Sequence, residues 1–60
     1  MTLLMLIENH LRRTGIAPSR FGREAAGDPR LVHDMRRGRD VRRRLEMRVR
    51  AYIVKSGAAA

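Results

Sequence analysis

The sequence predicts an all-α fold, a compact four-helix domain that contains a helix-turn-helix. Apolar residues recur at intervals of three and four, capping residues and glycines divide the chain into short segments, and no segment alternates in the manner of a strand. With 60 residues and no cysteine, the chain must build a lean core from helix packing. Disulfides and thiolate metal sites are therefore excluded.

The first helix is expected from about Thr2 to Arg13, with Thr2 as its N-cap and Gly15 placed to end it. Its inner stripe comprises Leu3, Ile7, Leu11 and Thr14, with His10 beside them as a packing residue. The second helix is short and should start near Pro18 and stop at Gly27. Its small residues would let a neighbouring helix approach closely; they are Gly22, Ala25 and Ala26.

The third helix has the clearest expected boundaries. Asp28 is its predicted N-cap, Pro29 its first residue, and Gly38 follows its last turn. An apolar stripe on one side comprises Leu31, Val32 and Met35. The opposite side carries three side chains that can be cationic, at spacings of three and four: Arg30, His33 and Arg37.

The fourth helix is expected from Val41 to about Lys55, with Asp40 as its N-cap. Its core face comprises Val41, Leu45, Val49 and Tyr52. A weaker second stripe comprises Met47, Ala51 and Val54. The predicted domain covers residues 1–56, and residues 57–60 are predicted to be a disordered tail.

Charge is the strongest indication of function. Fourteen basic residues against six acidic ones give a net charge of +8, and Lys55 is the only lysine. Such an excess indicates a polyanionic partner or a negatively charged surface. Arginine in particular offers a planar fork that can bind phosphate or guanine through two hydrogen bonds.

Four short motifs in the middle of the chain carry a resemblance. They are Phe21-Gly22-Arg23, Gly27-Asp28-Pro29, Leu31-Val32 and Arg37-Gly38-Arg39. On these motifs, the stretch from Pro18 to Tyr52 resembles repressor/Cro-like helix-turn-helix domains, and most of all short stand-alone proteobacterial regulators of the phage and gene-transfer-agent type. It differs from common repressors in lacking a glutamine at the start of the second helix.

The resemblance implies a sequence-specific transcription regulator that binds double-stranded DNA, and it implies where the contacts lie. The residues expected at base edges are Arg30, His33, Asp34 and Arg37. Those expected at phosphates are Arg20, Arg23, Arg36, Arg39, Arg42 and Arg43. A homodimer would fit this function, and its candidate contact residues are Met5, Met47 and Val54.

Other functions are weaker on the sequence. An enzyme is not expected, because the few acids, histidines and hydroxyls form no spaced nucleophile–base set, and neither a cofactor, a metal nor a small-molecule substrate is implied. The alternative is a protein-interaction adaptor, for example one that binds RNA polymerase. Membrane-surface binding and stacking on single-stranded RNA are disfavoured because Phe21 and Tyr52 are the only aromatic side chains. The expected location is the cytoplasm, since neither a signal peptide nor a spanning segment is recognisable.

Overall fold

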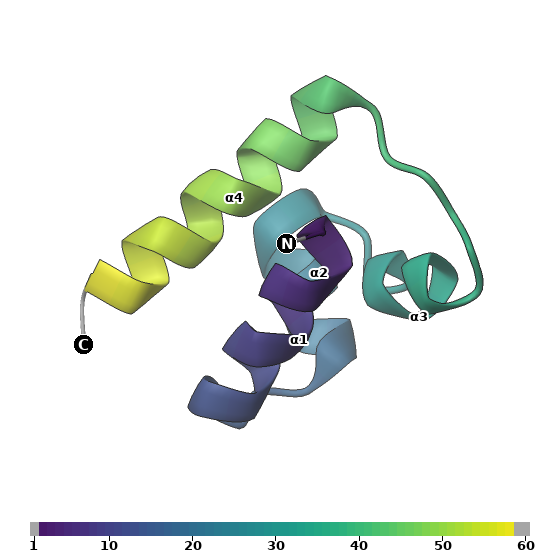
Figure 1. Cartoon of the computed structure of the whole chain (residues 1–60). Helices are drawn as coiled ribbons and strands as arrows, with labels where there is room; N and C mark the ends of the chain where they lie inside the picture. The colour runs from purple at the N-terminus through teal and green to yellow at the C-terminus, as the bar shows by residue number, and fades with distance from the viewer. Residues whose placement is uncertain (1, 59–60) are drawn as a thin grey trace.

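The computed structural model describes residues 2–58, and within them the chain forms four α-helices and no strand. The helices are α1 (Leu3–Thr14), α2 (Pro18–Ala26), α3 (Leu31–Arg36) and α4 (Arg43–Ala58). The predicted all-α, four-helix fold is confirmed. In Figure 1, α4 runs along one side of the molecule, and an extended segment connects its first turn to the short α3. Both α3 and α4 pack against α1 and α2.

The first two helices have the boundaries that their capping residues predict. The Thr2 hydroxyl accepts a hydrogen bond from the Met5 backbone N–H at 3.1 Å. At the other end of α1, Gly15 adopts a left-handed conformation with φ 74°, and its N–H donates to the Leu11 carbonyl at 2.8 Å. Gly27 ends α2 in the same way, with φ 67°.

The predicted start of α3 is wrong by two residues. The Asp28 carboxylate accepts a hydrogen bond from the Arg30 N–H at 3.0 Å, as a capping residue would. However, the Asp28 carbonyl accepts from the Leu31 N–H at 3.1 Å, three residues on, which is the spacing of a tight turn. Pro29 and Arg30 therefore form a turn, and the helix begins at Leu31.

The predicted start of the fourth helix is also wrong, because Asp40 does not cap it and α4 begins only at Arg43. The Arg39 backbone N–H donates to the Asp34 carbonyl at 2.9 Å, so the chain folds back on α3 before it moves away. At the other end, α4 continues to Ala58. The predicted tail is thus helical at residues 57 and 58, and residues 59 and 60 lie outside the described part.

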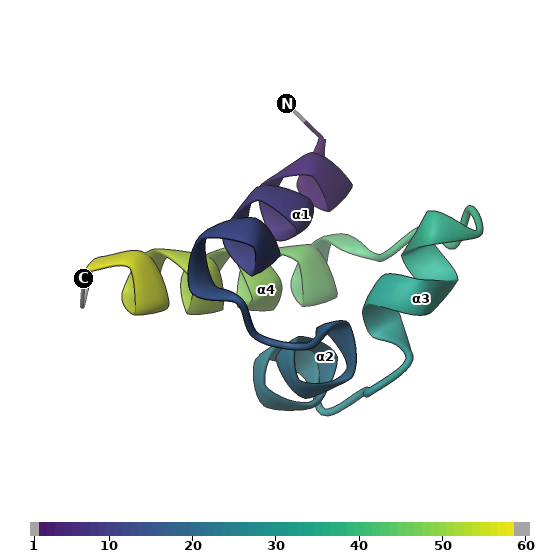
Figure 2. The same ribbon diagram turned by 90° about the horizontal axis from the view of Figure 1, so that it is seen from below.

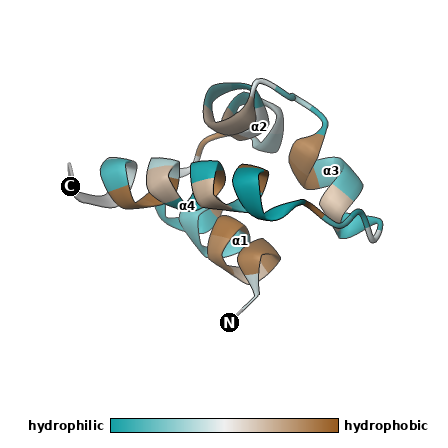
Figure 3. Ribbon diagram, turned by 90° about the horizontal axis from the view of Figure 1, so that it is seen from above, coloured by the Kyte–Doolittle hydropathy of each residue, from teal (hydrophilic) through white to brown (hydrophobic). Residues whose placement is uncertain are grey.

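Each helix contributes to one core. Its buried apolar members are Leu3, Ile7, Leu11, Phe21, Ala25, Leu31, Val32, Met35 and Val49. Figure 3 shows the apolar residues of α1 and α3 and, in contrast, the strongly hydrophilic first turn of α4. The inner stripe predicted for the third helix is confirmed, and so is that of the first helix at Leu3, Ile7 and Leu11. The prediction for Thr14 is wrong, because this residue is exposed and its hydroxyl donates to the His10 carbonyl. On the core face predicted for the fourth helix, Val49 is buried while Val41, Leu45 and Tyr52 are partly buried. Removal of these side chains from water is the main stabilising contribution in a domain of this size.

An aromatic cluster joins three of the helices. His10 of α1 is 1% exposed and lies with its ring centroid 5.4 Å from Phe21 of α2 and 6.1 Å from Tyr52 of α4. Phe21 and Tyr52 meet edge to face at 5.5 Å. The interpretation of His10 as a packing residue is confirmed. Burial lowers the pKa of His10, with a smaller contribution from the positive charge of Arg13, so the imidazole is favoured in its neutral form.

Candidate nucleic-acid interface

Helix α3 has one face held in the core and one face open to solvent. Leu31 and Val32 are completely buried and Met35 is 9% exposed. On the solvent side, His33 is exposed, as are the residues that flank the helix, Arg30 and Arg37. Within the described residues none of the three solvent-side residues is in a salt bridge, so all three side chains are available to a ligand. Figure 2 shows α3 at one end of the molecule, on the opposite side from the C-terminal end of α4.

The turn that leads into α3 is fixed by a close backbone approach at Gly22. A β-carbon at this position would overlap the Asp28 carbonyl oxygen and would come within 3.3 Å of the Leu31 β-carbon. The Gly22 carbonyl also accepts a hydrogen bond from the Asp28 N–H at 3.1 Å. Glycine therefore lets the turn lie directly against α2, and this contact sets the position of α3.

A single guanidinium joins the turn before α3 to the helix itself. Arg39 donates from Nη1 to Asp28 Oδ2 at 2.7 Å and to Asp34 Oδ2 at 3.3 Å. The hydrogen bond from Arg39 lowers the pKa of Asp28, and the Arg30 backbone N–H adds to this shift. Asp34, expected at a base edge, and Arg39, expected at a phosphate, are thus brought together as partners of each other.

Arg36 joins α3 to α1. It donates from Nε and Nη2 to the two carboxylate oxygens of Glu8, at 2.7 and 2.8 Å. This two-pronged hydrogen bond lowers the pKa of Glu8 and raises that of Arg36. Because its donors face α1, Arg36 orients α3, and this internal role differs from the predicted phosphate contact.

Arg20 has an acidic partner on its own helix. Its Nε donates to Glu24 Oε2 at 2.8 Å, and the Tyr52 hydroxyl donates to the other Glu24 oxygen at 2.7 Å. These two bonds lower the pKa of Glu24, the bond from Arg20 contributing most, and the bond to Glu24 raises the pKa of Tyr52. Arg20 is otherwise solvent-exposed, so the Arg20–Glu24 pair lies at the surface of α2, and the hydrogen bond from Tyr52 to Glu24 connects α2 to α4.

The remaining cations have no acidic partner among the described residues. Every acidic side chain except Asp40 is in a salt bridge, and the arginines that pair with them are Arg20, Arg36, Arg39 and Arg50. The cations without such a partner are Arg12, Arg13, Arg23, Arg30, Arg37, Arg42, Arg43, Arg44, Arg48 and Lys55. The acidic residues therefore organise the fold, and the uncompensated charge lies at exposed positions.

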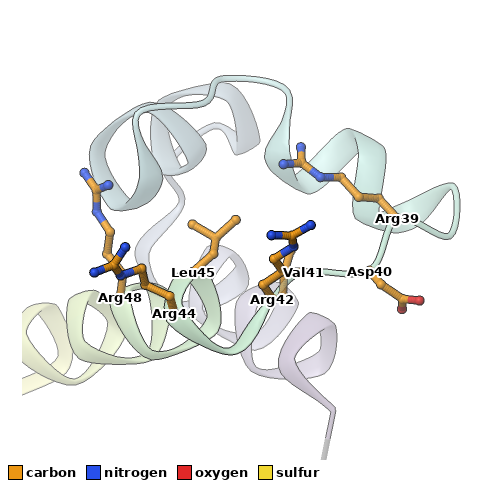
Figure 4. A pocket seen from close by; sticks show the side chains of 7 residues that line it. All are labelled: Arg39, Asp40, Val41, Arg42, Arg44, Leu45 and Arg48. Atoms are coloured by element: carbon orange, nitrogen blue, oxygen red, sulfur yellow. The ribbon is translucent and has the colours of Figure 1, made fainter.

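Several of these arginines surround a groove of about 680 Å³ between the first turns of α4 and the segment that follows α3. Figure 4 shows the Arg39 and Arg42 guanidinium groups on one side, those of Arg44 and Arg48 on the other, and Leu45 between them. The Asp40 carboxylate points away from the groove (Figure 4). An anion entering it would meet the guanidinium groups of Arg42, Arg44 and Arg48, which favours a phosphate-bearing ligand. The Arg39 Nη1 at the edge of the groove already donates to Asp28 and Asp34.

Arg44 and Arg48 were absent from the residues expected at DNA. They lie four residues apart, which places them on one side of a helix, and this spacing is the signal in the sequence that could have identified them. Arg39 contributes to the same groove because the segment between α3 and α4 carries it alongside the first turns of α4. The path of this segment was not predicted, since the fourth helix was expected to begin at Val41.

The three candidate dimer residues are exposed. Met5 is 52%, Met47 58% and Val54 69% exposed. Met47 and Val54 share one side of α4, seven residues apart, whereas Met5 lies on α1. The three residues thus come from two helices, and the dimer stays a prediction.

Comparison with family models, with curated proteins and with solved structures found no match. The Cro-like resemblance therefore stays a prediction, and function must be argued from the side chains themselves. Within residues 2–58, no helix is both long and apolar enough to cross a bilayer, and no three potential metal ligands gather in one place.

Proposed function

We propose that this protein binds double-stranded DNA sequence-specifically, with α2 and α3 acting as a helix-turn-helix, and that it acts as a small transcription regulator. The observation that carries the proposal is the two-sided character of α3. Leu31, Val32 and Met35 hold one side in the core. On the other side, His33 and the flanking Arg30 and Arg37 are exposed and form no salt bridge within residues 2–58. A reading helix requires this combination of a buried anchor and long polar side chains in solvent.

The chemistry of the exposed side fits the major groove of DNA. A guanidinium can donate two hydrogen bonds to the O6 and N7 atoms of a guanine, and each such pair contributes about 1–3 kcal/mol of discrimination. Arg30 and Arg37 are the residues to which we assign this role, and His33 between them can add a single hydrogen bond. Asp34 is less suited to a base contact, because its carboxylate is already a partner of Arg39.

Phosphate binding is best assigned to the arginines that have no internal partner. Of the predicted set, these are Arg23, Arg42 and Arg43, and the groove adds Arg44 and Arg48. Arg36 already donates from Nε and Nη2 to Glu8, and Arg39 donates from Nη1 to Asp28, so a phosphate would compete with these carboxylates for the two side chains. We therefore assign these two residues to the positioning of α3 and not to DNA contact.

The proposal is tested by selecting duplexes from a random pool and measuring their affinity for the full chain at several salt concentrations. We expect enrichment of a defined sequence. We also expect log K to fall linearly with log salt, with a slope near −0.9 for each phosphate neutralised. Equal affinity for selected and random duplexes would contradict the reading role of α3, and the absence of any salt-dependent duplex binding would contradict the proposal as a whole.

A further inference from the structure

Helix α4 carries a second apolar surface that the core does not use. Val49 faces the core and is completely buried. Met47 and Val54 are 58% and 69% exposed, and Ala51 between them is exposed as well. At 3.6 residues per turn, these three positions lie on the side of α4 opposite Val49. We call Met47, Ala51 and Val54 the outer stripe.

Cations border the outer stripe on both sides. At helical spacing, Arg44, Arg48 and Lys55 follow one edge, and Arg43 lies at the other. Within the described residues of α4 the single acidic side chain is Glu46, and it is taken by Arg50 at 2.8 Å. The apolar stripe is thus enclosed by positive charge that nothing in the described fold neutralises.

The apolar residues of the outer stripe and the cations beside them together indicate which kind of partner could bind there. A second copy of α4 would bring the same cations against one another, which disfavours self-association. Nucleic acid would neutralise the arginines but would leave the methionine and valine side chains in water. A bilayer surface calls for large apolar or aromatic side chains such as Trp, Phe and Leu, and the stripe has none of these.

We propose that the outer stripe of α4 is a docking site for an acidic amphipathic helix of a protein partner. The partner would place apolar side chains at positions i, i+4 and i+7 on the stripe, and glutamate or aspartate at the flanking positions opposite the cations. Seven residues separate Met47 from Val54, so the apolar contact extends over about 10 Å of helix axis. A partner helix of about 12–15 residues would also reach the flanking charges.

The experiment uses the full chain, without DNA, and three synthetic helical peptides as probes. The first has a leucine stripe flanked by glutamates. The second keeps the leucines and has glutamine for glutamate, and the third keeps the glutamates and has serine for leucine. Affinities are measured by fluorescence anisotropy at low and physiological salt, and the helical content of the chain and its variants is checked by circular dichroism.

Two neutral variants separate the stripe from the rest of the surface. M47S/V54S removes the apolar contact without changing the charge, and M5S alters an equally exposed methionine on α1 as a matched control. We expect the acidic amphipathic peptide to bind most tightly, M47S/V54S to weaken it by about tenfold or more, and M5S to leave it unchanged. Equal binding of either control peptide, or an M5S effect as large as that of M47S/V54S, would overturn the proposal.

Two further measurements test the other possible partners of the outer stripe, a second copy of the chain and a lipid bilayer. Sedimentation of the full chain would overturn the proposal if it showed a dimer that M47S/V54S converts to monomers. Binding to vesicles of phosphatidylglycerol and phosphatidylcholine would overturn it if that binding, and not peptide binding, depended on Met47 and Val54. Because DNA is absent throughout, these results are independent of whether the chain recognises duplexes.

Discussion

The close approach at Gly22 predicts that the smallest possible side chain will destabilise the protein there. In an ordinary helix interior, glycine to alanine gains about 1 kcal/mol through helix propensity. At Gly22 the added β-carbon would overlap the Asp28 carbonyl oxygen and meet the Leu31 β-carbon at 3.3 Å. Overpacking costs about 1–3 kcal/mol, and the upper end applies here because the obstructing atom belongs to the backbone of a turn. We therefore expect Gly22→Ala to lose a net of about 2 kcal/mol.

Thermal and urea unfolding followed by circular dichroism measure this effect. For a domain of this length, about 2 kcal/mol corresponds to a fall in Tm of roughly 16 °C. Ser19→Ala is the matched control, because Ser19 is an exposed residue of the same helix and alanine there should be neutral or slightly stabilising. If Gly22→Ala were as stable as the wild type, the gain from helix propensity would equal or exceed the cost of steric overlap. The turn before α3 could then not lie as close to α2 as the Gly22–Asp28 contact requires.

Three more predictions concern the buried His10 and two of the paired arginines, Arg36 and Arg39. Because burial lowers the folded-state pKa of His10 below its ordinary value of 6.5, the unfolded chain takes up the proton first as the pH falls. Stability should thus be level above about pH 7 and decline between about pH 6 and pH 5 in urea titrations. His33→Ala should keep this decline and His10→Leu should abolish it, whereas the further loss expected below about pH 4.5, where Glu8, Glu24 and Asp28 are protonated, should remain. Arg36→Gln should lower Tm and raise hydrogen exchange in α3, whereas Arg37→Gln should change neither, since Arg37 holds no carboxylate. Arg39→Gln should leave the salt slope of duplex binding unchanged while it reduces the preference for a selected sequence; a slope smaller by about 0.9 would instead place Arg39 on a phosphate.

The ends of the first two helices could be predicted because they are encoded locally. Thr2 offers its hydroxyl to a backbone N–H three residues away, and Gly15 and Gly27 adopt left-handed conformations that other residues avoid. The core stripe of the third helix could also be predicted, since Leu31, Val32 and Met35 follow the helical period. Each of these features depends on residues within one or two turns.

The predicted end of α3 is confirmed, because Gly38 follows its last turn with a positive φ of 106°. The starts of α3 and α4 and the pairing of the charges on α3 could not be predicted in this way. Arg36 meets Glu8 across 28 positions of sequence, and Arg39 reaches back to Asp28 across 11. Both pairs exist only after the helices have packed, and the second accompanies the fold-back that delays α4 to Arg43. An arginine-rich sequence does not indicate which arginines form salt bridges with carboxylates. The residues predicted at phosphates therefore included both arginines that are paired within the protein and arginines that are not.

In the proposed complex, the open side of α3 contacts DNA bases while the arginines around the start of α4 bind the DNA backbone. The most direct test compares Arg37→Ala with Arg43→Ala on a selected duplex and on a random one. We expect Arg37→Ala to lower the ratio of the two affinities by about tenfold or more, because one bidentate base contact is lost. Arg43→Ala should weaken both duplexes by the same factor and leave the ratio unchanged. Equal losses on both duplexes from both substitutions would contradict this division between α3 and α4.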